Sequence, residues 1–230
     1  MQPVNPCSVF EAVKEEFLMG IPSDTMPVGV LLGGQGAVGK GQLNLWAEKL
    51  YESHQFLAIN GDNYRIWHPD FNDLRKNIWT FSEKTQQFSA VFTEGFIRES
   101  FQRQLSFVVE GTMRSPEIPV RTATALRNQG YASAAFAIAA PKEISLMNVF
   151  NRYYREVQNK GFGRMVDISS HNDAVEGLPK SLDRLFYEKI ILDSAKKTIQ
   201  GLTDETVKEA ALQVYRQLVE SIKNSTPSIC

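Results

Sequence analysis

Residues 34 to 41 read GQGAVGKG, and a short apolar run over residues 28 to 32 leads directly into them. Glycines in such a loop let successive backbone N–H groups turn inward around an anion, and Lys40 can reach the β- and γ-phosphates of a nucleotide. Beyond the loop, apolar residues repeat at helical spacing: Leu43, Ala47 and Leu50. A strand, a glycine-rich loop and a helix in this order predict a phosphate-binding loop, with a ligand-free glycine turn as the alternative.

Nucleotide binding is assigned to every residue of this loop: Gly34, Gln35, Gly36, Ala37, Val38, Gly39, Lys40, Gly41 and Gln42. The position after the lysine normally carries a Ser or Thr whose hydroxyl binds Mg²⁺, but here it is Gly41. Phosphate oxygens, waters and carboxylates would then have to hold the metal. We therefore expect ATP or GTP together with Mg²⁺ as cofactors, without a hydroxyl ligand from the loop.

Strand-like and helix-like segments alternate along the rest of the chain. Short apolar runs predict strands at residues 28–32, 56–59, 107–109, 134–139 and 189–192. Helical periodicity lies between and after them, at residues 86–105, 118–129, 142–158 and 203–223. This alternation predicts an α/β fold with a parallel sheet flanked by helices, a three-layer sandwich like that of P-loop nucleotide kinases. Ligands bind such a sheet beyond the carboxyl ends of its strands.

The same patterns divide the chain into segments. Residues 1–26 are predicted to form an N-terminal helical extension, because a helix start at Ser8 is followed by an apolar stripe that ends at Gly20. Residues 27–200 are predicted to form the domain that carries the phosphate-binding loop. Residues 201–230 are predicted to form a charged amphipathic helix, packed on that domain or extending from it.

Composition narrows the classes of partner. The 230 residues include 25 basic and 26 acidic ones, so no overall positive field favours nucleic acid or a membrane surface, and a small-molecule substrate is expected. Cys7 and Cys230 lie near opposite ends of the chain, which indicates neither a disulfide framework nor a metal site. The sequence shows no leader-like or membrane-spanning apolar stretch. These features predict a cytoplasmic protein, with delivery into another cell by a secretion system left open.

Asp62 follows the second predicted strand in the stretch AINGDNYR, residues 58–65. Its carboxylate would emerge at the same sheet edge as the phosphate-binding loop. In phosphoryl transfer to an alcohol, such a carboxylate accepts the hydroxyl proton and orients the nucleophile. We therefore predict that Asp62 is the general base; the alternative is that it only caps the following helix or turn.

Glu110 and Thr112 end the third predicted strand in FVVEGTMR, residues 107–114. A carboxylate, a glycine and a hydroxyl emerge there together, so Glu110 is expected to hold Mg²⁺ through water, and Thr112 and Arg114 to contact substrate. The alternative is an ordinary turn that leaves a strand. Glu94 lies on the same face of its predicted helix as several apolar residues. A charged group there needs water, a hydrogen-bond donor or a ligand. Glu94 is therefore expected either in the wall of a pocket or at the edge of that face, where it reaches solvent.

Two arginines lie in a predicted helix and in the lid-like segment that follows it. Arg152 lies in the predicted helix at residues 142–158, and Arg164 lies in the glycine-containing segment that follows. Guanidinium groups that reach in from a lid neutralise charge as a phosphoryl group moves, and lid closure excludes water. Arg152 and Arg164 are therefore predicted catalytic residues together with Lys40 and Asp62, and a solvated basic face is the alternative for such cations.

With these motifs placed, the chain resembles the zeta toxin family of bacterial toxin–antitoxin systems, from about Val28 to Leu192. The motifs that carry the resemblance are the phosphate-binding loop, NGDNYRIWHPDF (60–71), FTE (92–94), VVEGTMR (108–114), EIPVRTA (117–123), QGY (129–131), the Arg152 and Arg164 pair, and the stretch from Arg164 to His171. Their order and spacing are far more specific than the loop alone.

The resemblance implies a small-molecule kinase. The best-known members of the family transfer the γ-phosphoryl group of ATP or GTP to the 3′-hydroxyl of the sugar in UDP-N-acetylglucosamine, which poisons the supply of cell-wall precursors. By position, Lys40 would hold the nucleotide phosphates, Asp62 would be the base, and Arg152 and Arg164 would stabilise the transferring group. The residues that the resemblance places against the sugar-nucleotide are Glu94, Glu110, Thr112 and Thr122.

Other functions remain open beside this one. A kinase of a nucleoside or a dinucleotide would have the same fold and loop. Gly41, where the family usually has Thr or Ser, also suits a regulator or immunity protein that binds nucleotide without transferring phosphate, although such a protein has no need of Asp62. Because members of the family are silenced by a small separate antitoxin, an antitoxin partner is expected, and inhibition in cis by residues 1–26 is a further hypothesis.

Overall fold

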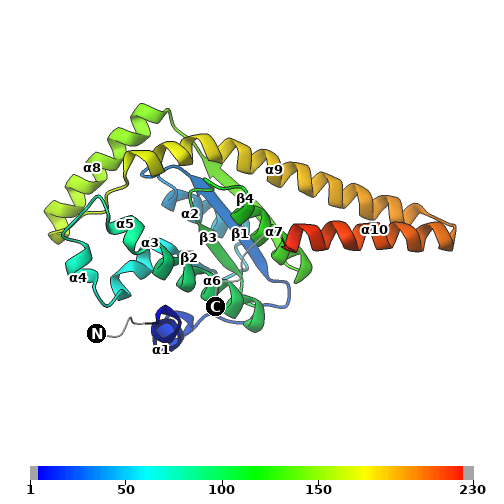
Figure 1. Cartoon of the computed structure of the whole chain (residues 1–230). Helices are drawn as coiled ribbons and strands as arrows, with labels where there is room; N and C mark the ends of the chain where they lie inside the picture. Colours follow the sequence, from blue (N-terminus) through cyan, green and yellow to red (C-terminus); the bar gives the residue numbers. More distant parts are fainter. Residues whose placement is uncertain (1–4, 225–230) are drawn as a thin grey trace.

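The structure is a computed structural model that describes residues 5 to 224, without the side chains of residues 187–195, 218, 219 and 221–224. Its strands form a parallel sheet in the order β2-β3-β1-β4 (Figure 1). The strands are β1 (Val28–Gly34), β2 (Leu57–Asn60), β3 (Phe107–Glu110) and β4 (Ala132–Ile138). Every residue of β1 is buried, as expected for a central strand that is covered on both faces. The predicted α/β class is confirmed.

Alternate residues of the strands pack against different layers of helices. Leu31, Ile59 and Phe107 belong to one apolar cluster, whereas Val30 and Val108 belong to another on the opposite face of the sheet. Among the helices that pack into the two clusters are α1 (Pro6–Leu18), α6 (Gln86–Arg103) and α7 (Glu117–Asn128) for the first, and α2 (Gly41–Leu50) for the second. Helices therefore cover both faces of the sheet.

The N-terminal helix α1 is part of the core. The Phe10 side chain is 1% exposed, and its ring centroid lies 5.0 Å from that of Phe96 in α6. A Cβ atom added at Gly95 would lie 2.6 Å from the Phe10 ring, so the two helices approach closely only because residue 95 is a glycine. Lys14 of α1 donates a hydrogen bond of 2.8 Å to Glu99 of α6. Cys7 of α1 is disulfide-bonded, so the expectation of no disulfide is wrong for this residue.

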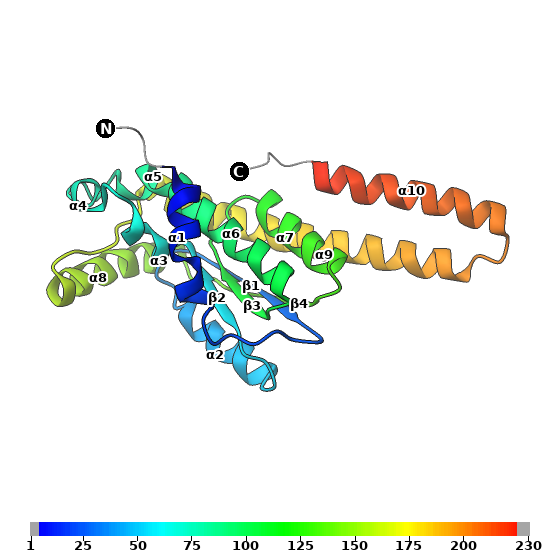
Figure 2. The ribbon, with the colours of Figure 1, turned by 90° about the horizontal axis from the view of Figure 1, so that it is seen from below.

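The remaining elements are α3 (Gly61–Tyr64), the 3-10 turn η1 (Arg65–Trp67), α4 (Phe71–Leu74), α5 (Phe81–Lys84), α8 (Lys142–Lys160), α9 (Ile168–Gly201) and α10 (Glu205–Asn224). The two views agree that α9 and α10 lie side by side and project beyond the sheet (Figure 1, Figure 2). In the part of the chain that the structure describes, we find no helix with the length and apolar character needed to cross a membrane.

The predicted fifth strand is wrong. Residues 189–192 lie within α9, a helix of 34 residues. Periodicity alone cannot assign an apolar run as short as KIIL to a strand or a helix, and the neighbouring Glu, Lys and Ala residues favour a helix. In the sheet formed by the described residues, β4 is therefore an edge strand, and exposed and partly buried side chains alternate along most of it.

Three strands end at the same edge of the sheet. Leu32 of β1 and Asn60 of β2 are both in register with Glu110, the last residue of β3. Gly111 then donates a backbone hydrogen bond of 2.9 Å to Leu32, which ties the end of β3 to that of β1. The segments that follow these strands therefore begin side by side, and they carry the phosphate-binding loop, Asp62 and Thr112.

Candidate active site

A cavity of about 1710 Å³ opens at this edge of the sheet. Its walls come from the loop after β1, from α3, from the end of β3 and from α6, α7 and α8. A pocket for one drug-sized ligand has a volume of about 300–1,000 Å³. This cavity is therefore large enough to hold a nucleotide and a second small molecule at the same time.

The phosphate-binding loop forms one end of the cavity. Its chain turns through left-handed conformations at Ala37 (φ 59°) and Gly39 (φ 89°). The α2 helix begins at Gly41, and no side chain caps its N-terminus. The N–H groups of Gln42 and Leu43 donate to the carbonyl oxygens of Gly39 at 3.0 Å and Lys40 at 2.8 Å, so among the described hydrogen bonds it is the Gly41 N–H, at the start of the helix, that stays available to an anion. Gly36, Ala37, Gly39, Lys40 and Gly41 line the cavity.

Lys40 is folded back onto its own loop. Its Nζ donates hydrogen bonds to the carbonyl oxygens of Gly34 at 2.9 Å and Gln35 at 2.8 Å. Burial lowers the pKa of Lys40, and the nearby carboxylates of Glu110 and Asp62 oppose that shift. A triphosphate in the loop would offer Nζ stronger, charged acceptors than these two carbonyl groups.

Other residues of the predicted nucleotide site do not reach the cavity. The described residues that line it do not include Gly34, Gln35, Val38 or Gln42. Gln35 instead makes a reciprocal pair with the backbone of Ala140: its Nε2 donates to the Ala140 carbonyl at 3.1 Å, and its Oε1 accepts from the Ala140 N–H at 3.2 Å. The Gln35 side chain therefore anchors the loop to the segment that leads into α8.

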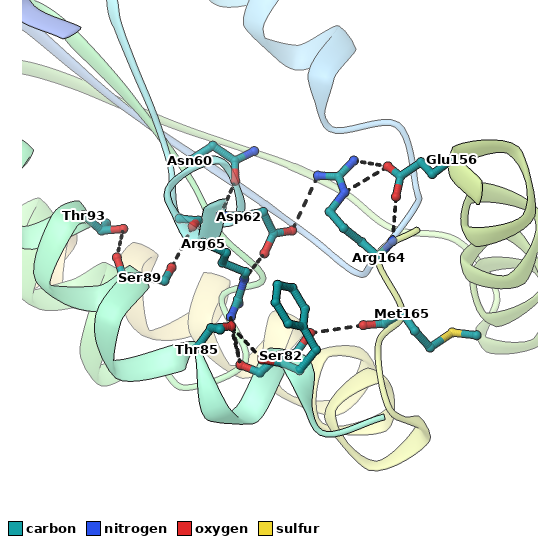
Figure 3. A network of polar contacts seen from close by, with 12 residues as sticks. Asn60, Asp62, Arg65, Ser82, Thr85, Ser89, Thr93, Glu156, Arg164 and Met165 are labelled. Atoms are coloured by element: carbon teal, nitrogen blue, oxygen red, sulfur yellow. Dashed lines mark hydrogen bonds and ion pairs between the residues drawn. The ribbon is translucent and has the colours of Figure 1, made fainter. Parts of the chain in front are cut away.

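Asp62 lies in the first turn of α3, and its carboxylate is not the cap of that helix. The cap is Asn60, whose side chain accepts a hydrogen bond of 3.0 Å from the Asp62 N–H. The alternative that Asp62 only caps a helix or turn is therefore excluded. Asp62 Oδ1 instead accepts from Arg65 Nε at 2.9 Å, and Asp62 Oδ2 lies 3.8 Å from Arg164 Nη1 (Figure 3).

The charges around Asp62 keep it ionised. Burial by itself raises the pKa of the Asp62 carboxyl group. The charge of Arg65, its hydrogen bond, and the charges of Arg164 and Arg152 outweigh burial, so the pKa lies below the ordinary aspartate value. Asp62 is therefore a carboxylate at neutral pH that can accept a hydrogen bond on the cavity side.

Arg152, on α8, carries unsatisfied donors. Its Nε and Nη2 atoms are buried and have no hydrogen-bond partner among the described residues. Burial and the positive charge of Arg164 lower the pKa of Arg152, whereas the negative charges of Asp62, Glu156 and Glu110 raise it; the net effect is a lowered pKa. Buried donors without partners are costly, and an anion in the cavity would satisfy them.

Arg164 lies in the segment between α8 and α9. Glu156 of α8 accepts hydrogen bonds from its Nε at 2.9 Å, from its backbone N–H at 2.7 Å and from Nη2. The hydrogen bond to Glu156 is the main cause of the raised pKa of Arg164. Glu156 thus aims Arg164 toward Asp62 and the cavity, as Figure 3 shows.

The other predicted site residues also line this cavity: Glu94, Glu110, Thr112, Arg114 and Thr122. Glu94 is neither a bare charge nor a residue turned away to solvent, because Arg121 Nη2 of α7 donates to its Oε1 at 2.5 Å. Thr122 donates to the Ile118 carbonyl of its own helix at 3.1 Å, and Arg114 Nη1 donates to Ser170 Oγ at 3.3 Å. All five predicted substrate residues therefore lie in the lining of the same cavity as the phosphate-binding loop.

The described residues contain no group of three or more His, Cys, Asp or Glu side chains that could hold a metal ion. Glu110 lines the cavity, whereas Asp62 is engaged by Arg65.

Sequence reasoning missed three residues that orient the predicted ones: Arg65, Arg121 and Glu156. The spacing of Arg65, three residues after Asp62 at the start of a helix, is a signal that could have found it. Arg121 and Glu94 belong to different helices and lie 27 residues apart, so no local spacing marks their contact.

Comparison with known proteins gives a consistent picture. The family model of the zeta toxin matches residues 14–216. Toxin PezT of Streptococcus pneumoniae is 30% identical over 135 residues, which cover 58% of this chain and 53% of that protein. Toxin zeta of Enterococcus hirae is 30% identical over 175 residues, which cover 74% of this chain and 60% of that protein. The chain thus spans little more than half the length of these curated relatives.

A solved structure agrees with these relatives. It comes from the characterisation of the PezAT chromosomal toxin–antitoxin system of Streptococcus pneumoniae, and it matches with a TM-score of 0.60 at 25% identity over 67% of this chain and 65% of that chain. The predicted P-loop kinase-like fold is confirmed by this match. The family model covers most of the chain, so the predicted resemblance is confirmed as well: this chain belongs to the zeta toxin family.

Proposed function

We propose that this protein transfers the γ-phosphoryl group of ATP or GTP to a hydroxyl group of a sugar-nucleotide, UDP-N-acetylglucosamine or a close relative, and that it acts as a toxin. The observation that carries the proposal is the shared cavity. The phosphate-binding loop, Asp62 and Arg152, which carries buried donors without a described partner, all line the same cavity. That combination suits phosphoryl transfer, in which positioning and charge neutralisation supply most of the catalysis.

The loop end of the cavity suits the nucleotide. The Gly41 N–H at the start of α2 and the Nζ atom of Lys40 would bind the β- and γ-phosphates. Bound Mg²⁺ would neutralise phosphate charge, held by phosphate oxygens, waters and Glu110. Gly41 contributes no hydroxyl ligand.

The centre of the cavity suits the transfer itself. Asp62 would accept a hydrogen bond from the acceptor hydroxyl and take its proton as the new P–O bond forms and the bond from the γ-phosphorus to the bridging oxygen breaks, which releases ADP or GDP. Arg152 and Arg164 would bind the transferring group, because both line the cavity and both act on Asp62 through their charges. Arg164 would then exchange its long contact with Asp62 for a phosphoryl oxygen.

The far wall suits an acceptor rich in hydroxyl groups. Glu94, Glu110 and Thr112 offer oxygen acceptors for sugar hydroxyls, and Arg114 and Arg121 offer donors for an anionic part of the molecule. The choice of a sugar-nucleotide rests on the family to which the chain belongs.

A separate antitoxin protein is the proposed partner. The study that describes the similar solved structure concerns a toxin–antitoxin system. Residues 5–26 pack elsewhere and do not line the cavity, so the geometry gives no support to inhibition in cis by this segment.

The test is a phosphorylation screen with γ-labelled ATP or GTP, Mg²⁺ and a panel of sugar-nucleotides, nucleosides and dinucleotides. We expect label on a sugar-nucleotide, and a loss of kcat of about 10²- to 10⁴-fold in Asp62→Asn with nucleotide affinity unchanged. Asp73→Asn is the matched control, because that exposed aspartate pairs only with Lys76 on the surface among the described contacts.

Different outcomes separate the alternatives. Label on a nucleoside or a dinucleotide would replace the proposed acceptor and keep the kinase. Nucleotide binding without label on any acceptor would instead favour a regulator or immunity protein, the function that the missing hydroxyl at Gly41 also suits.

A further inference from the structure

Arg65 is held at both ends of its guanidinium group. Its Nε donates to Asp62 Oδ1 at 2.9 Å, while its Nη1 donates to the Ser82 carbonyl at 2.8 Å and to Thr85 Oγ1 at 2.5 Å. The residue is only 8% exposed, although it forms part of the cavity wall. Its position is therefore set by α5 on one side and by Asp62 on the other.

The anchor on α5 is itself rigid. Thr85 is fully buried, and its hydroxyl donates to the Phe81 carbonyl at 2.7 Å while it accepts from Arg65. Arg65 Nε, Arg65 Nη1 and Thr85 Oγ1 therefore each have a partner, as a network that fixes geometry requires.

We infer that Arg65 is a positioning residue for the proposed phosphoryl transfer: it holds Asp62 Oδ1 in place and so presents Oδ2, ionised, to the acceptor hydroxyl. This inference rests on the proposed function. A carboxylate with one oxygen in a charged hydrogen bond has lost its freedom to rotate, so the other oxygen keeps a single direction. Arg65 has no predicted contact with nucleotide or acceptor.

The other charges near Asp62 do not hold it in the same way. The charged groups that act with Asp62, apart from Arg65, come from the loop, α8 and the segment after α8: Lys40, Arg152 and Arg164. Glu110, at the end of β3, acts on these same three cations. Lys40 bonds to the loop carbonyls, Arg164 stays 3.8 Å away, and Arg152 has partnerless donors. These three cations are placed to turn to phosphate, whereas the α5 contacts keep Arg65 on Asp62.

The same turn of α5 also reaches the segment that carries Arg164. Ser82 accepts from Arg65 through its carbonyl group, and its hydroxyl donates to the Met165 carbonyl at 3.1 Å. Figure 3 shows the resulting chain from Asp62 through Arg65 and Ser82 to Met165. Ser82 of α5 therefore contacts both Arg65 and Met165, the residue next to Arg164. These contacts fix the positions of Arg65 and Arg164 relative to each other.

The first test removes the contact with Arg65→Gln. We expect kcat for the labelled acceptor to fall by about 10- to 100-fold, with the KM for both substrates changed by less than about threefold. Arg65→Lys keeps the charge but cannot contact Asp62 and α5 together, so it should recover only part of the loss. Arg103→Gln is the matched control, because Arg103 also pairs with carboxylates but lies outside the cavity lining.

A double-mutant cycle shows whether Arg65 acts through Asp62. In the Asp62→Asn background, Arg65→Gln should cost less than about twofold, because the carboxylate that it positions is already gone. Equal losses in both backgrounds would overturn the inference and leave Arg65 a structural residue.

Titration gives a readout that needs no acceptor. Arg65 helps to keep the pKa of Asp62 low, so Arg65→Gln should move the carboxyl ¹³C NMR titration of Asp62 to higher pH. The acid limb of kcat/KM should move in the same direction. An unchanged Asp62 titration in a folded Arg65→Gln protein would refute the inference. Failure of the proposed function is a different result: the wild type would phosphorylate no compound.

A second pair of variants covers the case in which Arg65→Gln fails to fold. Thr85→Val removes the hydroxyl that anchors Nη1 and leaves the contact with Asp62 untouched. We expect a loss of kcat of about threefold to tenfold with nucleotide affinity unchanged, and a smaller loss in Thr85→Ser, which keeps the hydroxyl. Identical kcat in Thr85→Val and the wild type would contradict the inference.

Discussion

The two ends of the cavity are built in different ways. The nucleotide end is one continuous loop with the start of the next helix, whereas the acceptor wall combines side chains from the end of β3, from α6 and from α7. The loop lines the cavity with three glycines, Ala37 and Lys40, whereas the acceptor wall includes side chains that are already paired, such as Glu94 with Arg121. Recognition of phosphate is therefore a local property of this chain, and recognition of the acceptor is a tertiary one.

Lys40→Ala should have the largest effect and should act on the nucleotide end alone. It removes the cation closest to the β- and γ-phosphates, so we expect nucleotide affinity to fall by about 100-fold in isothermal titration calorimetry. Lys49→Ala, an exposed lysine in the last turn of the same helix, is the matched control. Acceptor binding that falls as much as nucleotide binding would contradict the separation of the two ends.

Arg121→Gln should act on the acceptor wall alone. Loss of the pair would leave Glu94 without its donor, and we expect the KM for the acceptor to rise by about tenfold while nucleotide affinity stays constant. Steady-state kinetics with each substrate varied in turn measures both values. Arg98→Gln, an exposed arginine of α6 outside the cavity lining, should change neither.

Gly41→Thr should strengthen metal binding at the nucleotide end of the cavity, because it adds the hydroxyl group that this loop lacks. A Cβ atom at residue 41 would meet no heavy atom within 4 Å, so the new side chain fits. We expect the Mg²⁺ concentration for half-maximal activity to fall by about twofold to fivefold, because a hydroxyl ligand is added. A Mg²⁺ titration of both proteins measures this change, and an unaltered midpoint would mean that the metal is not bound near the loop.

Glu99→Gln should change neither end, because the residue joins α6 to α1 outside the cavity. Burial raises the pKa of Glu99, but its contacts with Lys14 and Arg103 outweigh burial, so the pKa is lowered in the folded protein. Such a group stabilises the fold above its unfolded pKa, about 4.3 for a glutamate, and this contribution is lost as the pH falls through the lower folded value.

We therefore expect the Glu99→Gln variant to unfold more easily at neutral pH, by about 1–3 kcal/mol, and to lose less stability than the wild type on acidification. Urea unfolding at a series of pH values measures this difference. Equal slopes of stability against pH in the two proteins would show that the Glu99 contacts do not stabilise the folded state.

Much of the fold followed from short sequence patterns. Four of the predicted strands form one parallel sheet, because each apolar run sits between turn or helix signals that are visible locally. The run at residues 189–192 was misassigned, since a short apolar segment looks alike in a strand and in a helix. The prediction that Asp62 faces the phosphate-binding loop depended only on the rule that parallel strands end at one edge of the sheet.

The sequence by itself determined the phosphate-binding loop, the class of fold and the edge at which the candidate groups meet. All three depend on residues that are close together in the chain, where spacing and backbone geometry decide the outcome. Only the tertiary structure decided that α5 anchors Arg65 and that Arg121 pairs with Glu94. The physical reason is that a hydrogen bond between two elements requires their packing to bring the atoms within about 3 Å, and no local pattern encodes that packing.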